Sequence, residues 1–219
     1  MRVSYWSHRK PVQRTRAVDV DEVARSAISL LDEGGLRALT VRAVAKHLGV
    51  AAASLYSRIE SVDDLFDLAL DRALGDDPDI REAIAGTSLP DLMLTHYRHL
   101  VRHRWACQVL GMRAPRGPHH LAFSERMIVL LVDAGAADPV GSAYALSNFV
   151  IGSATAAPMV DDERTAPIDA GSAPVYARLH AEHRTDPESI LIAGLEALHA
   201  RILLPAGDPP TDRAEDHQG

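Results

Sequence analysis

Residues 36–66 contain the pattern that most restricts the fold of this chain. Apolar residues recur there at three- and four-residue steps, as on one face of a short helix: Val41, Val44, Ala45 and Leu48. Thr40 can cap this helix, because its hydroxyl can accept a hydrogen bond from a free amide in the first turn. Gly49 lies where the helix must end and the chain must reverse, a position that favours positive φ. A second short helix ending in Leu55-Tyr56 completes a predicted helix-turn-helix, which lays its second helix in the major groove of DNA.

The same segment resembles the DNA-binding domain of the tetracycline-repressor (TetR) family, whose pattern is a leading helix followed by roughly LTVRxxAxxLGVSxxxLYxHFxxKxxL. The matching residues keep the order and spacing of that pattern: Leu39-Thr40-Val41-Arg42, Ala45, Leu48-Gly49-Val50, Leu55-Tyr56 and Leu65. Any small helical domain can have amphipathic helices and glycine stops, but this order of residues is much more specific. The resemblance implies an all-α fold, with an N-terminal three-helix helix-turn-helix domain followed by a helical domain for ligand binding and dimerisation.

The resemblance also assigns contacts with DNA. The second helix of the motif is expected over 52–58, and its groove-facing residues are Ala52, Ala53, Ser54 and Ser57. Hydroxyl and guanidinium groups orient a protein on DNA more than they read its sequence, so phosphate contacts are assigned to Thr40, Arg42, Tyr56 and Arg58. Because this helix has few long polar side chains, readout would depend on methyl contacts with thymine, on serines and on an N-terminal arm in the minor groove.

Two departures from the family pattern bear on DNA affinity. Tyr56 is followed by Ser57-Arg58-Ile59, where the family usually has an aromatic residue or His, then His or Arg, then Phe. Val62 stands at the start of the next helix, where a phosphate-contacting Lys is common. We therefore expect one phosphate contact to be missing, and the affinity to depend on Arg58 and on the arm.

Charge is distributed unevenly along the chain. Residues 1–58 contain ten Lys and Arg against five Asp and Glu, whereas the whole chain carries a formal net charge of −7. A basic head on an acidic body would orient the molecule toward phosphate. A solvated basic tail would produce part of the same asymmetry, so the charge supports the motif only weakly.

Composition favours a helical protein that stays inside the cell. Hydrophobic residues make up 47% of the chain and aromatic residues only 5%, so the core must consist mostly of Ala, Leu and Val. Cys107 is the single cysteine, which excludes an intramolecular disulfide and favours a reducing compartment. No apolar run reaches the roughly 18–20 residues that cross a bilayer, and no apolar region follows the basic N-terminus as in a secretory signal. We expect a cytoplasmic protein without membrane contact.

Breaks in helical periodicity divide the chain into four parts. They are a flexible basic arm (1–17), a helix-turn-helix domain (18–64, with a linking helix capped by Ser61), a ligand-binding and dimerisation domain (65–204) and a disordered tail (205–219). Helices are expected at about 19–33, 61–74, 89–105, 106–112, 118–135, 139–157 and 187–204, and 161–174 is expected to be mobile.

Helices 140–157 and 187–204 are apolar almost all round, which indicates burial on more than one side. An ordinary intrachain core would explain that pattern as well. The resemblance favours a homodimer, since the corresponding helices of the family form a four-helix dimer interface. A dimer would also place two recognition helices about one DNA turn apart on a palindromic site.

The resemblance further implies a small-molecule pocket in the helical domain. Its candidate lining residues are His96, Leu100, His103, Trp105, Met112, Phe123, Met127, Asn148 and Met159. The segments VLGMRAP and SNFVIG resemble the ligand domain of the tetracycline repressor, but Val109 stands where the Mg²⁺-binding histidine would lie. A metal-chelated tetracycline is therefore not expected, and the effector should be small and largely apolar.

Metal binding and catalysis are the remaining alternatives. His96, His99 and His103 share one predicted helical face near His119-His120, so a three-histidine metal site is conceivable, but no cysteine or carboxylate cluster completes it. The chain has no Gly-rich phosphate loop, nucleophile elbow or HExxH motif, so we expect neither an enzyme nor a bound cofactor. We expect a ligand-responsive repressor that binds a palindromic operator as a dimer. The alternative is a helical small-molecule or metal-binding protein whose degenerate head binds DNA weakly.

Overall fold

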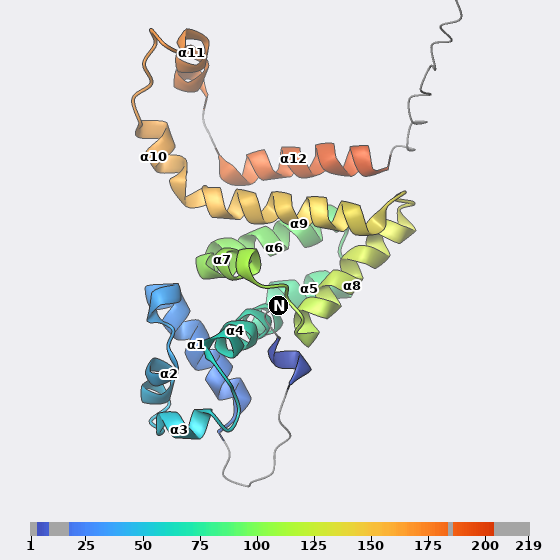
Figure 1. Ribbon diagram of the computed structural model, residues 1–219. Coiled ribbons are helices and arrows are strands. Elements are labelled where there is room, and N and C mark those ends of the chain that lie inside the picture. The colour runs from blue at the N-terminus through green and yellow to red at the C-terminus, as the bar shows by residue number, and fades with distance from the viewer. Residues whose placement is uncertain (1–3, 9–17, 184–185, 204–219) are drawn as a thin grey trace, which may run out of the picture.

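The computed structural model describes residues 4–8, 18–183 and 186–203, and every regular element in these ranges is a helix (Figure 1). The expected all-α fold is confirmed. The N-terminal elements are η1 (Tyr5–Ser7), α1 (Val20–Gly34), η2 (Leu36–Ala38), α2 (Val41–His47), α3 (Ala52–Leu55) and α4 (Val62–Asp76). The body contains α5 (Pro78–Gly86), α6 (Leu89–Arg102), α7 (Arg104–Met112), α8 (Pro118–Asp133), α9 (Pro139–Ala156), η3 (Ala157–Met159), α10 (Val160–Thr165), α11 (Pro174–Glu182) and α12 (Pro187–Ile202).

The head consists of α1, α2 and α3 around a small apolar core. Thr40 caps α2 as predicted, because its Oγ1 accepts a hydrogen bond from the Ala43 amide at 3.0 Å. Gly49 has a φ of +66°, which confirms that the turn between α2 and α3 needs a glycine. Leu55 is fully buried in the head core, whereas Val50 is only partly buried.

Helix α4 joins the head to the body. It packs against α1 on one side and against α5, α7 and α8 on the other, and most of its residues are buried (Figure 1). Ser61 caps it as predicted, through a hydrogen bond from the Asp63 amide at 3.2 Å. The predicted domain boundary at 64–65 falls inside this helix, so α4 belongs physically to both parts.

The centre of the body is formed by α6, α8 and α9, and α12 covers α6 and α9 (Figure 1). Helices α10 and α11 lie beyond one end of α9, and no residue of α11 is buried. Gly194 of α12 lies against Phe149 of α9, where a Cβ would come within 2.2 Å of the ring. This glycine therefore allows the close packing of the last helix on α9.

Several predicted boundaries are wrong. The expected helices do not include α5, although its start, Asp77-Pro78, has the same cap-plus-proline form as the starts of α9 and α12. The expected helix 89–105 breaks at His103 into α6 and α7, and α3 stops at Leu55 rather than at residue 58. The segment 161–174, expected to be mobile, begins within helix α10, and α11 follows it.

The expected flexible arm is wrong for residues 4–8, which form η1 and dock on α4 with Tyr5 buried. The rest of the arm (1–3 and 9–17) and the tail (205–219) lie outside the described residues. Within the described part of the chain, no helix is both long and apolar enough to cross a membrane.

Candidate nucleic-acid interface and effector domain

The predicted DNA-contacting residues lie on α2, on α3 and in the turn that follows α3. Most of their side chains are exposed: Thr40, Arg42, Ala53, Ser54, Tyr56 and Ser57, with Ala52 partly buried. Tyr56 is 52% exposed, so its ring and hydroxyl are open to a partner. The Ser57 hydroxyl donates to the Ser54 carbonyl at 2.7 Å and is therefore partly engaged within the turn.

Arg58 does not fit its predicted phosphate contact. It is only 8% exposed, and its Nε donates to the Val18 carbonyl at 3.1 Å. The guanidinium therefore fastens the end of the helix-turn-helix to the chain that enters α1. Sequence reasoning missed three exposed basic residues of the head, Arg37, Lys46 and His47, which could serve phosphates instead.

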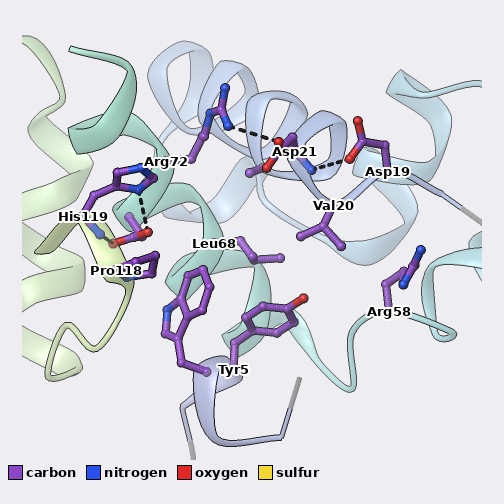
Figure 2. Close-up of a pocket in the computed structure, with 12 residues that line it drawn as sticks. Tyr5, Asp19, Val20, Asp21, Arg58, Leu68, Arg72, Pro118 and His119 are labelled. Atoms are coloured by element: carbon purple, nitrogen blue, oxygen red, sulfur yellow. Dashed lines mark hydrogen bonds and ion pairs between the residues drawn. The ribbon is translucent and has the colours of Figure 1, made fainter. Parts of the chain in front are cut away.

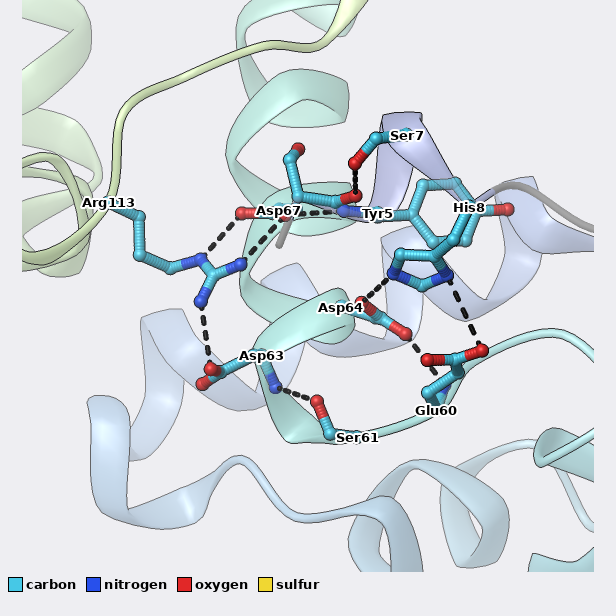
Figure 3. Close-up of polar contacts among 10 residues, drawn as sticks. Tyr5, Ser7, His8, Glu60, Ser61, Asp63, Asp64, Asp67 and Arg113 are labelled. Carbon is cyan, nitrogen blue, oxygen red and sulfur yellow. Dashed lines mark hydrogen bonds and ion pairs between the residues drawn. The ribbon is translucent and has the colours of Figure 1, made fainter. Parts of the chain in front are cut away.

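Helix α4 is held by a buried ion pair with the loop that precedes α8. Arg113 donates to the two carboxylate oxygens of Asp67, from Nε at 2.7 Å and from Nη2 at 2.9 Å (Figure 3). A third contact joins Arg113 Nη1 to Asp63 at 2.9 Å. The hydrogen bonds to Asp67 raise the pKa of Arg113, so the guanidinium remains charged although it is buried.

The N-terminal segment binds to the same face of α4. The Tyr5 amide donates to Asp67 Oδ2 at 2.9 Å, and His8 Nε2 lies 3.1 Å from Asp64 Oδ1 (Figure 3). Asp67 is thus shared between the N-terminus and the body loop. No periodic pattern in the sequence could reveal this contact, because it joins residues 62 positions apart.

One turn further along α4, Asp71 caps α8 from outside that helix. Its Oδ1 accepts from the backbone amides of His119 and His120, both at 3.0 Å, and its Oδ2 lies 2.8 Å from His119 Nδ1. Burial raises the pKa of the Asp71 carboxyl, but the hydrogen bonds from His120 and His119 outweigh it, so this pKa is lowered. A Cβ at Gly117 would lie 2.1 Å from Asp71 Cγ, so only glycine allows this approach.

A hollow of about 290 Å³ lies where η1, α1, α4 and the start of α8 meet (Figure 2). Its floor includes Val20, Leu68 and Pro118. Two ion pairs lie among its lining residues, Arg72 with Asp21 at 3.2 Å and His119 with Asp71. None of the predicted effector residues lines this hollow.

The predicted effector residues divide into two groups. The buried members are His96, Leu100, Trp105, Phe123 and Met127, and His103 is partly buried. Met112 and Met159 are 46% and 57% exposed, and Asn148 is exposed as well, so these three do not face the interior and their assignment is corrected. A second hollow, of about 410 Å³, lies between α1, the end of α4, the start of α5 and the α6–α7 junction, and only His103 of the predicted set lines it.

The three histidines of α6 and its end lie near one another but differ in their hydrogen-bond partners. His99 Nδ1 lies 2.8 Å from Asp77 Oδ2, and His103 Nδ1 lies 2.8 Å from Asp32 Oδ1. Neither ring nitrogen of His96 has a hydrogen-bond partner within the described residues. In the described part of the chain, no group of three or more His, Cys, Asp and Glu side chains is arranged to hold a metal ion.

Burial dominates the protonation of the inner two histidines. It lowers the pKa of His96 well below its usual value, and the neighbouring His99 and His120 add to this effect. For His99, burial lowers the pKa to about 4, although the hydrogen bond to Asp77 opposes the shift. Both rings are therefore neutral at physiological pH.

Two family models match this chain. The one described as "Bacterial regulatory proteins, tetR family" matches residues 23–69, and the one described as "Tetracyclin repressor-like, C-terminal domain" matches residues 88–183. Together the two matches cover more than half of the chain.

Two curated relatives show the same resemblance. An HTH-type transcriptional regulator of Saccharopolyspora erythraea is 35% identical over 159 residues, which span 69% of this chain and 66% of that protein. The HTH-type transcriptional repressor DrrR1 of Streptomyces coeruleorubidus is 32% identical over 146 residues, 62% of this chain and 52% of that protein. The chain thus matches between about half and two thirds of the length of these relatives.

A solved structure, the TetR family protein ActR of Streptomyces coelicolor in complex with actinorhodin, has a TM-score of 0.68 to this chain. It is 25% identical, and the match covers 89% of this chain and 99% of ActR. The family models, the curated relatives and the solved structure agree, and the chain belongs to the TetR family of bacterial regulatory proteins.

Proposed function

We propose that this protein is a transcriptional repressor that binds a palindromic operator as a dimer and releases it when a small, largely apolar effector enters the body. The observation that carries the proposal is the link from an exposed helix-turn-helix, through α4, to the body. Asp67 binds α4 to the loop before α8 and Asp71 binds it to the start of α8, both by buried contacts, so a shift of α8 would be transmitted to α4. Such a regulator acts on DNA, and we place it in the cytoplasm.

The DNA surface that we propose keeps Thr40, Arg42, Ala52, Ala53, Ser54, Tyr56 and Ser57, and adds Arg37, Lys46 and His47. The small residues of α3 would read thymine methyl groups and base edges, while the cations of α2 and η2 would neutralise phosphates. Arg58 would act indirectly, by holding the motif against α1.

The dimer surface that we propose is formed by α9 and α12. No Asp, Glu, Lys or Arg lies in 139–156, yet exposed residues recur on α9 every four positions: Val140, Tyr144, Asn148 and Gly152. Ile190 and Ile192 of α12 add exposed apolar surface. An uncharged stripe of this length on a helix surface suits a second copy of the same helix better than water.

An effector in the body is supported by one solved structure, since ActR has been solved with actinorhodin bound. The name of DrrR1, a transcriptional repressor, supports repression. In this chain the buried set of predicted effector residues, His96, Leu100, Trp105, Phe123 and Met127, lies in the body core. An effector there would favour a body conformation in which α4 has moved and the two heads no longer match the half-site spacing.

A gel-shift assay with DNA from the region upstream of the protein's own gene tests the proposal. Arg42→Ala should weaken binding by about tenfold and lower the salt dependence by about one phosphate contact. Arg104→Ala, at an exposed position of α7 in the body, is the matched control and should leave binding unchanged. Absence of sequence-dependent binding at every salt concentration would instead favour a helical small-molecule or metal-binding protein with a degenerate head.

A further inference from the structure

His96 is a buried polar side chain that the fold leaves unsatisfied. It lies on α6, is 5% exposed, and neither Nδ1 nor Nε2 has a hydrogen-bond partner within the described residues. Buried polar groups in proteins are nearly always hydrogen-bonded, because burying one without a partner costs free energy. An apolar side chain at this position would avoid that cost, so the histidine is not there to stabilise the fold.

A second buried imidazole lies nearby. His120, on α8, is 5% exposed, and its Nδ1 makes only a long contact of 3.5 Å with Asp71 Oδ1. Phe123 follows it by one turn on α8 and packs against His96 with ring centroids 4.6 Å apart. His96, Phe123 and His120 therefore form an aromatic cluster between α6 and α8.

The aromatic cluster adjoins the contact between Asp71 of α4 and the start of α8. His120 Nδ1 lies 3.5 Å from Asp71 Oδ1, the same oxygen that accepts the His119 and His120 amides. The two hollows described above do not include His96 among their lining residues. Because His96 is buried between α6 and α8, insertion of a ligand beside this ring would separate the two helices and disturb the Asp71 cap.

We infer that His96 is the hydrogen-bond partner of the effector, and that the effector is an uncharged aromatic molecule carrying hydroxyl or hydroxyl-and-keto groups. This inference rests on the proposed function and specifies its ligand. The effector inserts beside Phe123, completes the hydrogen bonds that His96 lacks, and displaces the start of α8 from Asp71 of α4. The unsatisfied imidazole thus lowers the stability of the free protein but allows it to bind the effector.

The protonation state of His96 restricts the ligand chemistry. A neutral imidazole offers one donor and one acceptor, so it suits a hydroxyl or a hydroxyl-and-keto pair. Burial lowers the pKa of His96, which disfavours the imidazolium that a carboxylate or sulfonate would require. Phe123 and Met127, both buried on α8, provide the apolar surface for an aromatic ring.

The test uses danthron, an uncharged dihydroxyanthraquinone, with anthraquinone and anthraquinone sulfonate as comparison compounds. Isothermal titration of the full chain should give measurable binding of danthron, with affinity lower by about tenfold or more for anthraquinone, which lacks the hydroxyls. The sulfonate should bind no better than anthraquinone. Danthron should also release the upstream DNA in the gel-shift assay.

His96→Leu separates this role from a structural one. Removal of an unsatisfied buried group should raise the melting temperature of the free protein by about 2–4 °C. The same change should weaken danthron binding by about tenfold or more. His96→Gln keeps a donor and an acceptor and should retain part of the binding. Leu92→Met, at a fully buried α6 position, is the core control and should retain all of it.

Three results would overturn the inference. They are a wild type that binds none of the compounds or binds anthraquinone as well as danthron, a His96→Leu variant with wild-type affinity for danthron, and a His96→Leu variant that melts at a lower temperature. Failure of the ligand-free protein to bind its upstream DNA would contradict the proposed function instead. The two failures are therefore distinguishable.

Discussion

The buried carboxylate of Asp67 joins two distant parts of the chain, because it accepts hydrogen bonds from the Arg113 guanidinium and from the Tyr5 amide. Asp67→Ala would leave the Arg113 guanidinium buried without its main partner. We expect the free energy of unfolding to fall by about 3–5 kcal/mol, as measured by chemical denaturation. Asp79→Ala, which removes an exposed partner of Arg102, is the control and should change stability little.

The double variant Asp67→Leu/Arg113→Leu provides the contrasting case. Replacing a buried ion pair by apolar residues of similar volume is often neutral, so this variant should recover most of the lost stability. If Asp67→Ala proved as stable as the wild type, the buried ion pair would not hold α4 as we describe.

His99 predicts a pH dependence of stability. Its pKa in the folded protein is about 4, because burial disfavours the charged ring, whereas the unfolded chain has the ordinary value near 6.5. The unfolded state therefore binds more protons between these pH values, and the stabilisation present above pH 6.5 is lost as the pH falls toward 4. At about 1.4 kcal/mol per pH unit, the loss approaches about 3 kcal/mol.

Chemical denaturation at pH 7, 6 and 5 measures this slope. His99→Asn can keep the hydrogen bond to Asp77 without titrating, so the free energy of unfolding of this variant should fall less steeply as the pH is lowered. Part of the slope remains, because the pKa of buried His96 is also lowered. Identical slopes for the wild type and His99→Asn would contradict a buried, neutral His99.

At the scale of elements, the joint between α4 and α8 depends on Gly117. Gly117→Ala would place a methyl group 2.1 Å from Asp71 Cγ and force the two helices apart. We expect a loss of about 1–3 kcal/mol of stability, as for other overpacked sites. Gly86→Ala, at the end of α5 with open space around its Cβ, is the control and should be neutral or slightly stabilising. Equal thermal melts for the two variants would argue against a tight joint.

Local sequence signals predicted the elements where the cause is local. Thr40, Gly49 and the Asp-Pro pair at Asp138-Pro139 confirm this, because caps, positive φ and proline starts act within one turn of the chain. The similar pair Asp77-Pro78 starts α5, which the expected helices do not include although the same physical signal is present.

Contacts between residues far apart in the sequence could not be predicted from such local signals. Arg58 has the chemistry of a phosphate ligand, but the turn after α3 directs it toward the Val18 carbonyl. Tyr5 is buried by α4, which follows it at a long sequence distance. Of the predicted effector residues, Met112, Asn148 and Met159 are exposed, because helical position alone does not reveal which face another helix covers.

At the scale of the whole molecule, the proposed dimer surface on α9 can be tested directly. Tyr144→Glu places a charge in the centre of the exposed uncharged stripe, and we expect it to shift the protein from dimer to monomer. Analytical ultracentrifugation measures the mass. Leu121→Glu, at another exposed apolar position on α8, should leave the mass unchanged, and a dimeric Tyr144→Glu variant would place the interface elsewhere.

The most direct test of the central claim is the binding of the full chain to fluorescently labelled upstream DNA, followed by anisotropy and compared with a shuffled duplex. We expect two protomers on each operator and an affinity about a thousandfold or more above that for shuffled DNA at physiological salt. Equal affinity for the two duplexes, or one protomer on each operator, would contradict it.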